Sequence, residues 1–117
     1  MTDAVLTGAQ LAQALPADTN AVSLYSPGTN VIAELTGLLV TNVTANTPSY
    51  RVFHDDDGTT YSTATALYYD NAMAANTTEY ITFEPPIWMA DSTGNIAVRS
   101  SAASEITFTL YGIEHKD

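Results

Sequence analysis

Hydrophobic and polar residues alternate along much of this chain, and the alternation predicts β-strands. The most apolar run covers residues 30–44, where the two kinds of residue alternate on either side of Gly37. A glycine inside a strand pattern indicates a β-bulge or a bend. Shorter runs of the same kind lie at residues 50–54, 80–83 and 106–110. Because successive side chains of a strand point to opposite faces, each run is expected to turn one face toward a core.

Turn-forming residues separate these runs at regular intervals. Proline, glycine, asparagine and aspartate gather at residues 26–28, 45–48, 55–58, 70–77 and 91–94. Further short strands are expected near residues 22–25, 66–69 and 96–98, which makes about eight in all. Helices long enough to connect parallel strands are not expected anywhere. The pattern therefore predicts an all-β fold, an antiparallel β-sandwich that is jelly-roll-like.

The first twenty residues follow a different pattern. Leucine and alanine recur near helical spacing between Leu6 and Leu15, Thr7 is placed to cap a helix, and Pro16 would end it. A helix of about two turns is marginal without packing. We therefore expect a short N-terminal arm or helix at residues 1–20, followed by a β-sandwich domain at residues 21–117. Whether the arm stays loose or orders on a neighbouring subunit is left open.

Acidic residues dominate the charge of the chain. Thirteen Asp and Glu oppose only Arg51, Arg99 and Lys116, so the formal net charge is −10. Nucleic-acid binding needs a basic footprint that neutralises phosphates, and an anionic membrane surface attracts the same kind of footprint. We therefore expect neither a nucleic-acid nor a membrane partner. A basic partner, a cation or a neutral surface remains open.

The composition predicts a surface of hydroxyls and amides rather than ion pairs. Charged residues make up 14% of the 117 residues, against roughly 25% in typical soluble domains. Such surfaces are common where a chain packs against other chains, and also in β proteins with many edge strands. Cysteine is absent, which excludes disulfides, thiolate metal sites and cysteine nucleophiles. The N-terminal residues resemble no secretory signal, and no apolar run reaches the about 18 residues of a membrane span, so synthesis in the cytoplasm is expected.

The densest charge lies in an acidic turn, Asp55–Gly58, between an expected strand at residues 50–54 and a second one that reaches Tyr69. Paired aspartates before a glycine can supply oxygen ligands to a cation such as Ca²⁺. The later glutamate of a complete calcium loop is missing, since Thr, Tyr, Ser and Ala follow the turn. Aspartate and glycine are also the residues that a surface turn prefers. We favour the plain turn, and whether Asp55–Asp57 bind a cation stays open.

Catalytic chemistry has few candidate residues. His54 lies beside Asp55, which could orient it as a general base, while His115 lies close to the C-terminus. No nucleophile elbow of the G-x-S-x-G type occurs, and a metal site would require a second histidine near His54. A carboxylate pair for glycoside hydrolysis would have to come from Glu34, Glu79, Glu84 or Glu105. Solvated strand positions explain all of these residues more simply, so we predict no catalytic, cofactor-binding or metal-binding residues and no cofactor.

Tyrosine outnumbers phenylalanine by seven to three. Tyrosine and tryptophan suit half-wet interfaces, because they bury a ring and keep a polar tip in contact with water. An ordinary sandwich core and a sugar-binding platform use the same residues. Pro85 and Pro86 are expected to end strand pairing, which leaves Trp88 in a loop-like stretch. We expect Trp88 to make a contact between subunits.

Four segments, taken in order, resemble small structural proteins of tailed bacteriophages. The segments are LYSPGTNVIAELTGLLVTN, YRVFHDDDGTTY, ALYYDNAMAANTT and NIAVRSSAASEITFTLYG. They carry the opening Leu24-Tyr25 with Pro27, the strand end Val40-Thr41-Asn42, the segment from Ala66 to Asn76, and the last strand, Phe108 to Gly112. Together they lie within residues 21–113 and leave out the N-terminal arm. The resemblance implies a virion protein with a β-sandwich fold and no catalytic residues.

We therefore expect a non-enzymatic virion structural protein that decorates or cements a bacteriophage capsid. Its expected partners are the major capsid protein or other virion proteins and further copies of itself, as a homotrimer or another ring. A neck or tail accessory protein, and a β-sandwich module that binds host glycans, are the alternatives. A small hydrolase centred on His54 is a further rival.

Overall fold

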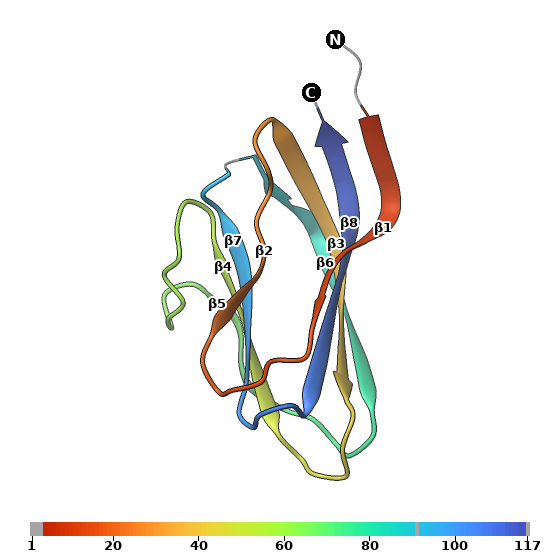
Figure 1. Cartoon of the computed structure of the whole chain (residues 1–117), viewed down its shortest axis with the longest axis vertical. Helices are drawn as coiled ribbons and strands as arrows, with labels where there is room; N and C mark the ends of the chain where they lie inside the picture. Colours follow the sequence, from red (N-terminus) through yellow and green to blue (C-terminus); the bar gives the residue numbers. More distant parts are fainter. Residues whose placement is uncertain (1–3, 91, 117) are drawn as a thin grey trace.

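Strands account for all the regular secondary structure in the computed structural model, which describes residues 4–90 and 92–116 (Figure 1). The eight strands are β1 (Ala4–Ala14), β2 (Val22–Tyr25), β3 (Val31–Asn42), β4 (Ser49–Asp55), β5 (Ala66–Ala72), β6 (Thr78–Met89), β7 (Asn95–Ser100) and β8 (Ile106–Lys116). None of the described residues forms a helix that is long and apolar enough to cross a membrane. The predicted all-β fold is confirmed.

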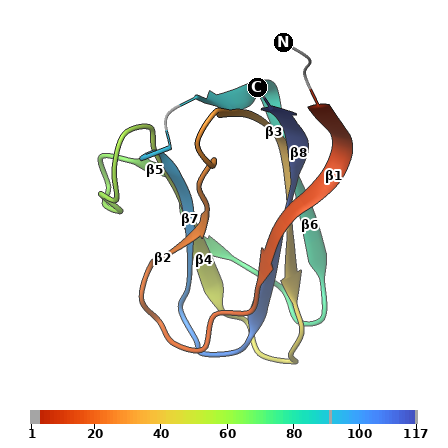
Figure 2. The ribbon, with the colours of Figure 1, turned by 45° about the horizontal axis from the view of Figure 1, so that its top comes forward.

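The strands form two four-stranded antiparallel sheets that face each other (Figures 1 and 2). Sheet A has the order β1-β8-β3-β6, and sheet B has the order β2-β7-β4-β5. Only β4 and β5 follow one another within one of these sheets, so each of the other connections crosses from one sheet to the other. Two sheets interleaved in this way form a jelly roll, and the predicted jelly-roll-like sandwich is confirmed.

The core lies between the inner faces of the two sheets. In β3 the inward positions are Ala33 and Leu35, and then Leu38 and Val40, all of which are fully buried. The change from odd to even positions coincides with a register shift between Leu35 and Gly37. The bulge predicted at Gly37 is therefore confirmed, and it allows one strand to keep apolar residues inward along its whole length.

The predicted N-terminal helix is wrong. Residues 4–14 form β1, which pairs with β8 from Ala4 opposite Lys116 to Ala14 opposite Phe108. The long edge of β8 offers backbone partners along eleven residues, whereas a helix of two turns would satisfy few of its own backbone groups. The division into an arm at residues 1–20 and a domain at residues 21–117 stays a prediction, and the pairing of β1 argues against it.

Strand β6 also continues farther than expected. Thr82 pairs with Gly37 and Ile87 with Leu35, so pairing stops around Pro85 and Pro86 and then resumes. Strand β6 lies at the edge of sheet A, where a proline without an N–H group removes few ladder hydrogen bonds. Trp88 is therefore a strand residue, and its expected position in a loop is wrong.

Candidate functional site

The outer face of sheet A exposes large apolar side chains. Ile32 on β3 is 44% exposed, and Tyr80 and Trp88 on β6 are 58% and 54% exposed. These positions alternate with the buried residues of the same strands, so their side chains point away from the core. Four half-buried side chains of β3 and β8 complete the face, namely Leu39, Tyr111, Ile113 and His115. Single exposed apolar residues are ordinary, but a group on one sheet face indicates a contact surface.

Trp88 is held in place by neighbours from two other strands. Its ring stacks on the imidazole of His115 in β8, with the ring centroids 5.5 Å apart and the planes inclined by 21°. The His115 Nε2 atom lies 3.4 Å from the Glu34 Oε1 atom in β3. This Trp88 cluster fixes the orientation of an exposed aromatic ring, which lowers the entropy cost when the ring enters an interface.

The ring of Tyr80 packs closely over Gly37, a residue without a side chain. A Cβ atom added at Gly37 would overlap with the phenol ring of Tyr80. The ring therefore lies close over the backbone of β3 at the bulge. The two exposed aromatic residues, Trp88 and Tyr80, thus stand on opposite sides of the break in β3–β6 pairing.

The outer face of sheet B is covered in part, although Leu67 and Tyr69 on β5 remain exposed. Phe53 pairs with Ala97, whose neighbours Ile96 and Val98 point into the core, so Phe53 and Ala97 face outward. Phe53 is nevertheless only 2% exposed. The ring of Tyr61, in the β4–β5 loop, packs against Phe53 with a centroid distance of 6.1 Å. The loop therefore forms a small second core on this side of the sandwich.

The acidic turn satisfies much of its own hydrogen bonding. The Asp55 carboxylate accepts hydrogen bonds from the backbone N–H groups of Thr60, at 2.8 Å, and Asp57, at 3.2 Å. These bonds, the one from Thr60 above all, hold the pKa of Asp55 below its usual value. The Asn95 amide donates to the Gly58 carbonyl at 2.8 Å and ties the turn to β7. No group of three metal-ligating side chains occurs among the described residues, and whether the turn binds a cation stays a prediction.

The structure places His54 near Asp56, whereas Asp55, its expected partner, accepts hydrogen bonds within the turn. The carboxylate nearest to the His54 Nε2 atom belongs to Asp56, at 3.8 Å, since Asp55 is engaged by the turn. The Nε2 atom is buried and has no hydrogen-bond partner among the described residues, so none of their serine hydroxyls is hydrogen-bonded to this atom. His115, which lies close to the C-terminus in the sequence, belongs to β8 and the Trp88 cluster.

The four candidate glutamates serve separate local contacts. Glu34 contacts His115 on the outer face of sheet A, and Glu79 accepts a long hydrogen bond of 3.5 Å from the buried Tyr50. Glu105 accepts a hydrogen bond of 3.0 Å from the Asn46 amide in the β3–β4 loop. Glu84 is exposed on β6. The structure shows no pair among them with a shared partner, as a glycosidase site would need.

The tyrosines divide into core and surface residues in a way that composition did not reveal. The Tyr25 hydroxyl donates to Glu114 at 2.6 Å, which joins β2 of sheet B to β8 of sheet A. Burial, reinforced by that carboxylate, raises the pKa of Tyr25 far above its usual range. Tyr50 packs edge-on against Phe108 in the core, and burial likewise raises its pKa. Tyr80 remains as the most exposed aromatic side chain described.

Comparison with known proteins supports the fold. No protein-family model matches this sequence, and no curated protein matches it. A chain in the structure of the infectious bursal disease virus Gx strain has a TM-score of 0.53 and 15% identity, over 98% of this chain and 33% of that one. The VP2 subviral particle of infectious bursal disease virus has a TM-score of 0.51 and 13% identity, over 97% and 32%.

The similarity between this chain and the viral chains is a similarity of fold. At this identity, the comparison shows that the chain has a β-sandwich of the kind found in proteins of a virus particle. The chain spans about a third of the length of the viral chains that it matches. What these neighbours assemble into bears on this protein only as support for a proposal.

Proposed function

We propose that this protein is a non-enzymatic virion structural protein that decorates or cements a bacteriophage capsid by bridging shell subunits. The observation that carries the proposal is the exposed aromatic face of sheet A on a jelly roll shared with virus-particle proteins. The resemblance of its sequence to structural proteins of tailed bacteriophages supports the bacteriophage origin and the decorating role. Its location is the virion, after synthesis in the host cytoplasm.

Adhesion through sheet A is the proposed mechanism. Trp88 and Tyr80 would enter pockets of the shell, where aromatic side chains contribute most to binding. The stack with His115 already orients Trp88, so binding orders little that is mobile. Many weakly bound copies on one shell would act together, and each further contact would bridge another pair of subunits.

The proposed partners follow from the charge of the chain and from the exposed face of sheet A. The net charge of −10 disfavours contact with packaged nucleic acid, so the protein would sit on the outside of the shell. Its partners are then the major capsid protein or other virion proteins, and further copies of itself in a trimer or another ring. A neck or tail position would use the same face, and imaging of the assembled particle would distinguish these positions by their symmetry.

Co-sedimentation with capsids assembled without this protein tests the proposal. We expect binding in near-stoichiometric ratio to the shell protein, and a loss of affinity of about 30-fold for Trp88→Ala, as for a central aromatic residue of an interface. Leu67→Ala, which truncates an exposed apolar residue on β5 of sheet B, is the matched control and should leave binding unchanged. Equal binding by both variants, or none by the parent protein, would refute the role of this face.

The Trp88 cluster favours one second candidate, a module that binds host glycans. An exposed indole beside the Glu34 carboxylate and the His115 imidazole offers a stacking surface and hydrogen-bonding groups of the kind a sugar ring needs. Glu34→Gln separates the two candidates, because a sugar would lose a charge-assisted hydrogen bond. Capsid binding that survives Glu34→Gln while a glycan array stays negative would support the structural role. A positive array signal that disappears in Glu34→Gln would support the glycan module.

A further inference from the structure

Two of the three Lys and Arg residues of the chain lie directly opposite each other. Arg51 on β4 pairs with Arg99 on β7, on the outer face of sheet B. Like charges at opposed positions of neighbouring strands destabilise a sheet unless anions compensate them. In a chain of net charge −10, this Arg51–Arg99 pair is the strongest concentration of positive charge.

Among the described residues, a single carboxylate compensates the pair. Asp70 binds Arg51 through two contacts, Nε to Oδ1 at 2.7 Å and Nη2 to Oδ2 at 3.2 Å. Asp70 has a left-handed backbone conformation, with a φ of 54°. At this position the register of β5 shifts, so that two residues, Tyr69 and Asp70, lie opposite Arg51 alone. The Tyr69 ring lies 3.9 Å from the Arg51 Cζ atom. Arg51 is therefore held on two sides, and Asp70 keeps its pKa below the usual value through the hydrogen bonds from Arg51.

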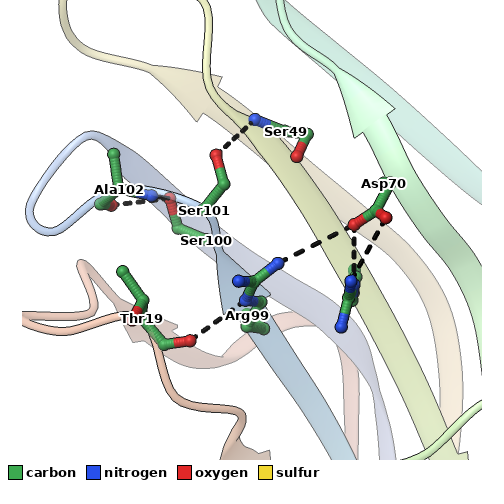
Figure 3. A network of polar contacts seen from close by, with 8 residues as sticks. Thr19, Ser49, Asp70, Arg99, Ser100, Ser101 and Ala102 are labelled. Carbon is green, nitrogen blue, oxygen red and sulfur yellow. Dashed lines mark hydrogen bonds and ion pairs between the residues drawn. The ribbon is translucent and has the colours of Figure 1, made fainter.

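Arg99 is compensated less completely. Its Nη1 atom lies 3.7 Å from Asp70 Oδ1, beyond hydrogen-bond distance. Its Nε–H group donates to the Thr19 carbonyl at 3.0 Å, which fixes the plane of the guanidinium beside Asp70 (Figure 3). An arginine has five N–H donors, and for Arg99 the described residues provide an acceptor within hydrogen-bond distance only at Nε. The terminal edge of Arg99 is thus oriented and retains capacity for a second carboxylate.

We propose that the Arg51–Arg99 pair receives the Asp56 carboxylate of the acidic turn, Asp55–Asp57, of a second copy of this chain. Charge complementarity identifies the occupant. The acidic turn is the densest acidic stretch of the chain, and the Asp56 side chain is 72% exposed. The β4–β5 connection that carries it projects from the side of the sandwich, where a neighbour can reach it (Figure 1).

The turn does not reach this pair within its own chain. The ion pairs of Arg51 and Arg99 among the described residues are with Asp70, and Asp56 lies near His54 instead. A neighbouring copy supplies the same turn, and receives the same contact, either in a reciprocal dimer or around a ring. The exposed Tyr69 on β5 lies beside Arg51 and would add apolar area. This contact uses sheet B, so it does not depend on the proposed attachment of sheet A to a capsid.

Sedimentation velocity of the purified full chain tests the proposal. We expect concentration-dependent self-association that is weak, with a dissociation constant on the order of 10–100 μM, because exposed ion pairs stabilise little individually. Arg99→Glu should weaken association by about tenfold or more. Lys116→Glu is the matched control, since it changes the net charge by the same amount away from sheet B, and it should associate like the parent chain.

A charge swap makes the test specific. Asp56→Lys should also weaken self-association by about tenfold or more, whereas Glu84→Lys, which changes the charge equally, should not. An equimolar mixture of the Arg99→Glu chain and the Asp56→Lys chain should associate again, because each supplies the partner that the other lacks. A monomeric parent chain, an Arg99→Glu chain that associates as the parent does, or a mixture that stays monomeric would overturn the proposal. If Arg99→Glu does not fold, the exposed-turn variant and its control still decide the question.

Discussion

The two outer faces of this sandwich are completed in different ways. On sheet B, the β4–β5 loop covers the outward-facing Phe53, and Arg51, Arg99 and Asp70 form a charged network. On sheet A no loop within the described part of the chain covers Trp88 and Tyr80, which remain more than half exposed. Both sheets bury their inner faces in the same core, so the fold itself does not require this difference.

The outer face of sheet B contributes to the stability of the monomer, whereas the outer face of sheet A is available for contact with another molecule. Burial of Phe53 beneath the loop removes apolar surface from water within one chain, which stabilises the monomer. The exposed aromatic residues of sheet A gain nothing comparable until another molecule covers them. We therefore expect substitutions on sheet B to change the free energy of unfolding, and substitutions on sheet A to change binding.

The largest expected effect concerns β1, which completes sheet A at its β8 edge. Deletion of residues 1–14 would leave the β1-facing edge of β8 unpaired between Phe108 and Lys116 and would uncover core contacts of Leu11 and Ala12. We expect the truncated chain to be unfolded or aggregated, because the total stability of such a domain is only about 5–15 kcal/mol. Circular dichroism and urea unfolding check this, with deletion of residues 1–3 alone as the control. A truncated chain with unchanged unfolding would instead show that the segment is an independent arm.

The sequence did not distinguish this strand from a helix. Leu6, Leu11 and Leu15 match a helical period over a short stretch, and the partner that decides the matter, β8, lies about a hundred residues away in the chain. Short apolar segments take the structure that their tertiary neighbours impose. The strands of residues 31–42, by contrast, could be predicted because their alternation is long and Gly37 marks the bulge.

Substitution of Phe53 should have the next largest effect on the free energy of unfolding. It tests directly whether the outer face of sheet B contributes more to stability than that of sheet A. Phe53→Ala should create a cavity beneath the β4–β5 loop and lower the free energy of unfolding by about 3–5 kcal/mol. Tyr80→Ala, on the open face, should change it by about 0.5 kcal/mol or less. Urea unfolding of both variants measures the difference. Equal losses would mean that the two faces contribute alike to stability, and would remove the basis for assigning contact to sheet A.

Neither outer face could be foreseen in detail from the sequence. Val52 and Phe53 are neighbours, so alternation predicts that they lie on opposite faces of a strand, but it does not predict that a loop covers the second face and that both are buried. Trp88 was expected to make contacts, but its stack on His115 joins residues that are distant in the chain. The cross-strand position of Arg99 beside Arg51 likewise depends on the order of strands in the sheet, which local patterns do not specify.

Alanine substitutions at Gly112 and Gly37 should differ by a smaller amount in the free energy of unfolding. A Cβ atom at Gly112 would overlap with the backbone carbonyl oxygen of Glu34, and backbone cannot move aside cheaply. Gly112→Ala should therefore cost about 1–3 kcal/mol in urea unfolding. A Cβ atom at Gly37 would meet only the ring of Tyr80, which is exposed and free to swing outward, so Gly37→Ala should cost clearly less while it weakens attachment through sheet A. The reverse order of stability would contradict the close packing of β8 against β3.

The smallest effect concerns the charged network of sheet B and depends on pH. Hydrogen bonds from Arg51 lower the pKa of Asp70 in the folded state. A carboxylate whose pKa is lower in the folded than in the unfolded chain stabilises the fold fully at a pH above the unfolded pKa, which is about 4. This stabilisation is lost as the pH falls through the pKa of the folded state. Urea midpoints at neutral and acidic pH should therefore fall less steeply on acidification for Asp70→Asn than for the parent chain.

Glu84→Gln, which removes an exposed carboxylate on β6, provides the control for Asp70→Asn and should retain the acid sensitivity of the parent chain. The same Asp70→Asn variant links the network to self-association. Loss of Asp70 frees the donors of Arg51 for an external carboxylate, so the variant should bind the acidic turn of a second copy more tightly in sedimentation velocity. Weaker association in this variant would instead indicate that Asp70 positions the arginines, so that the orientation of the pair matters more than its spare donors.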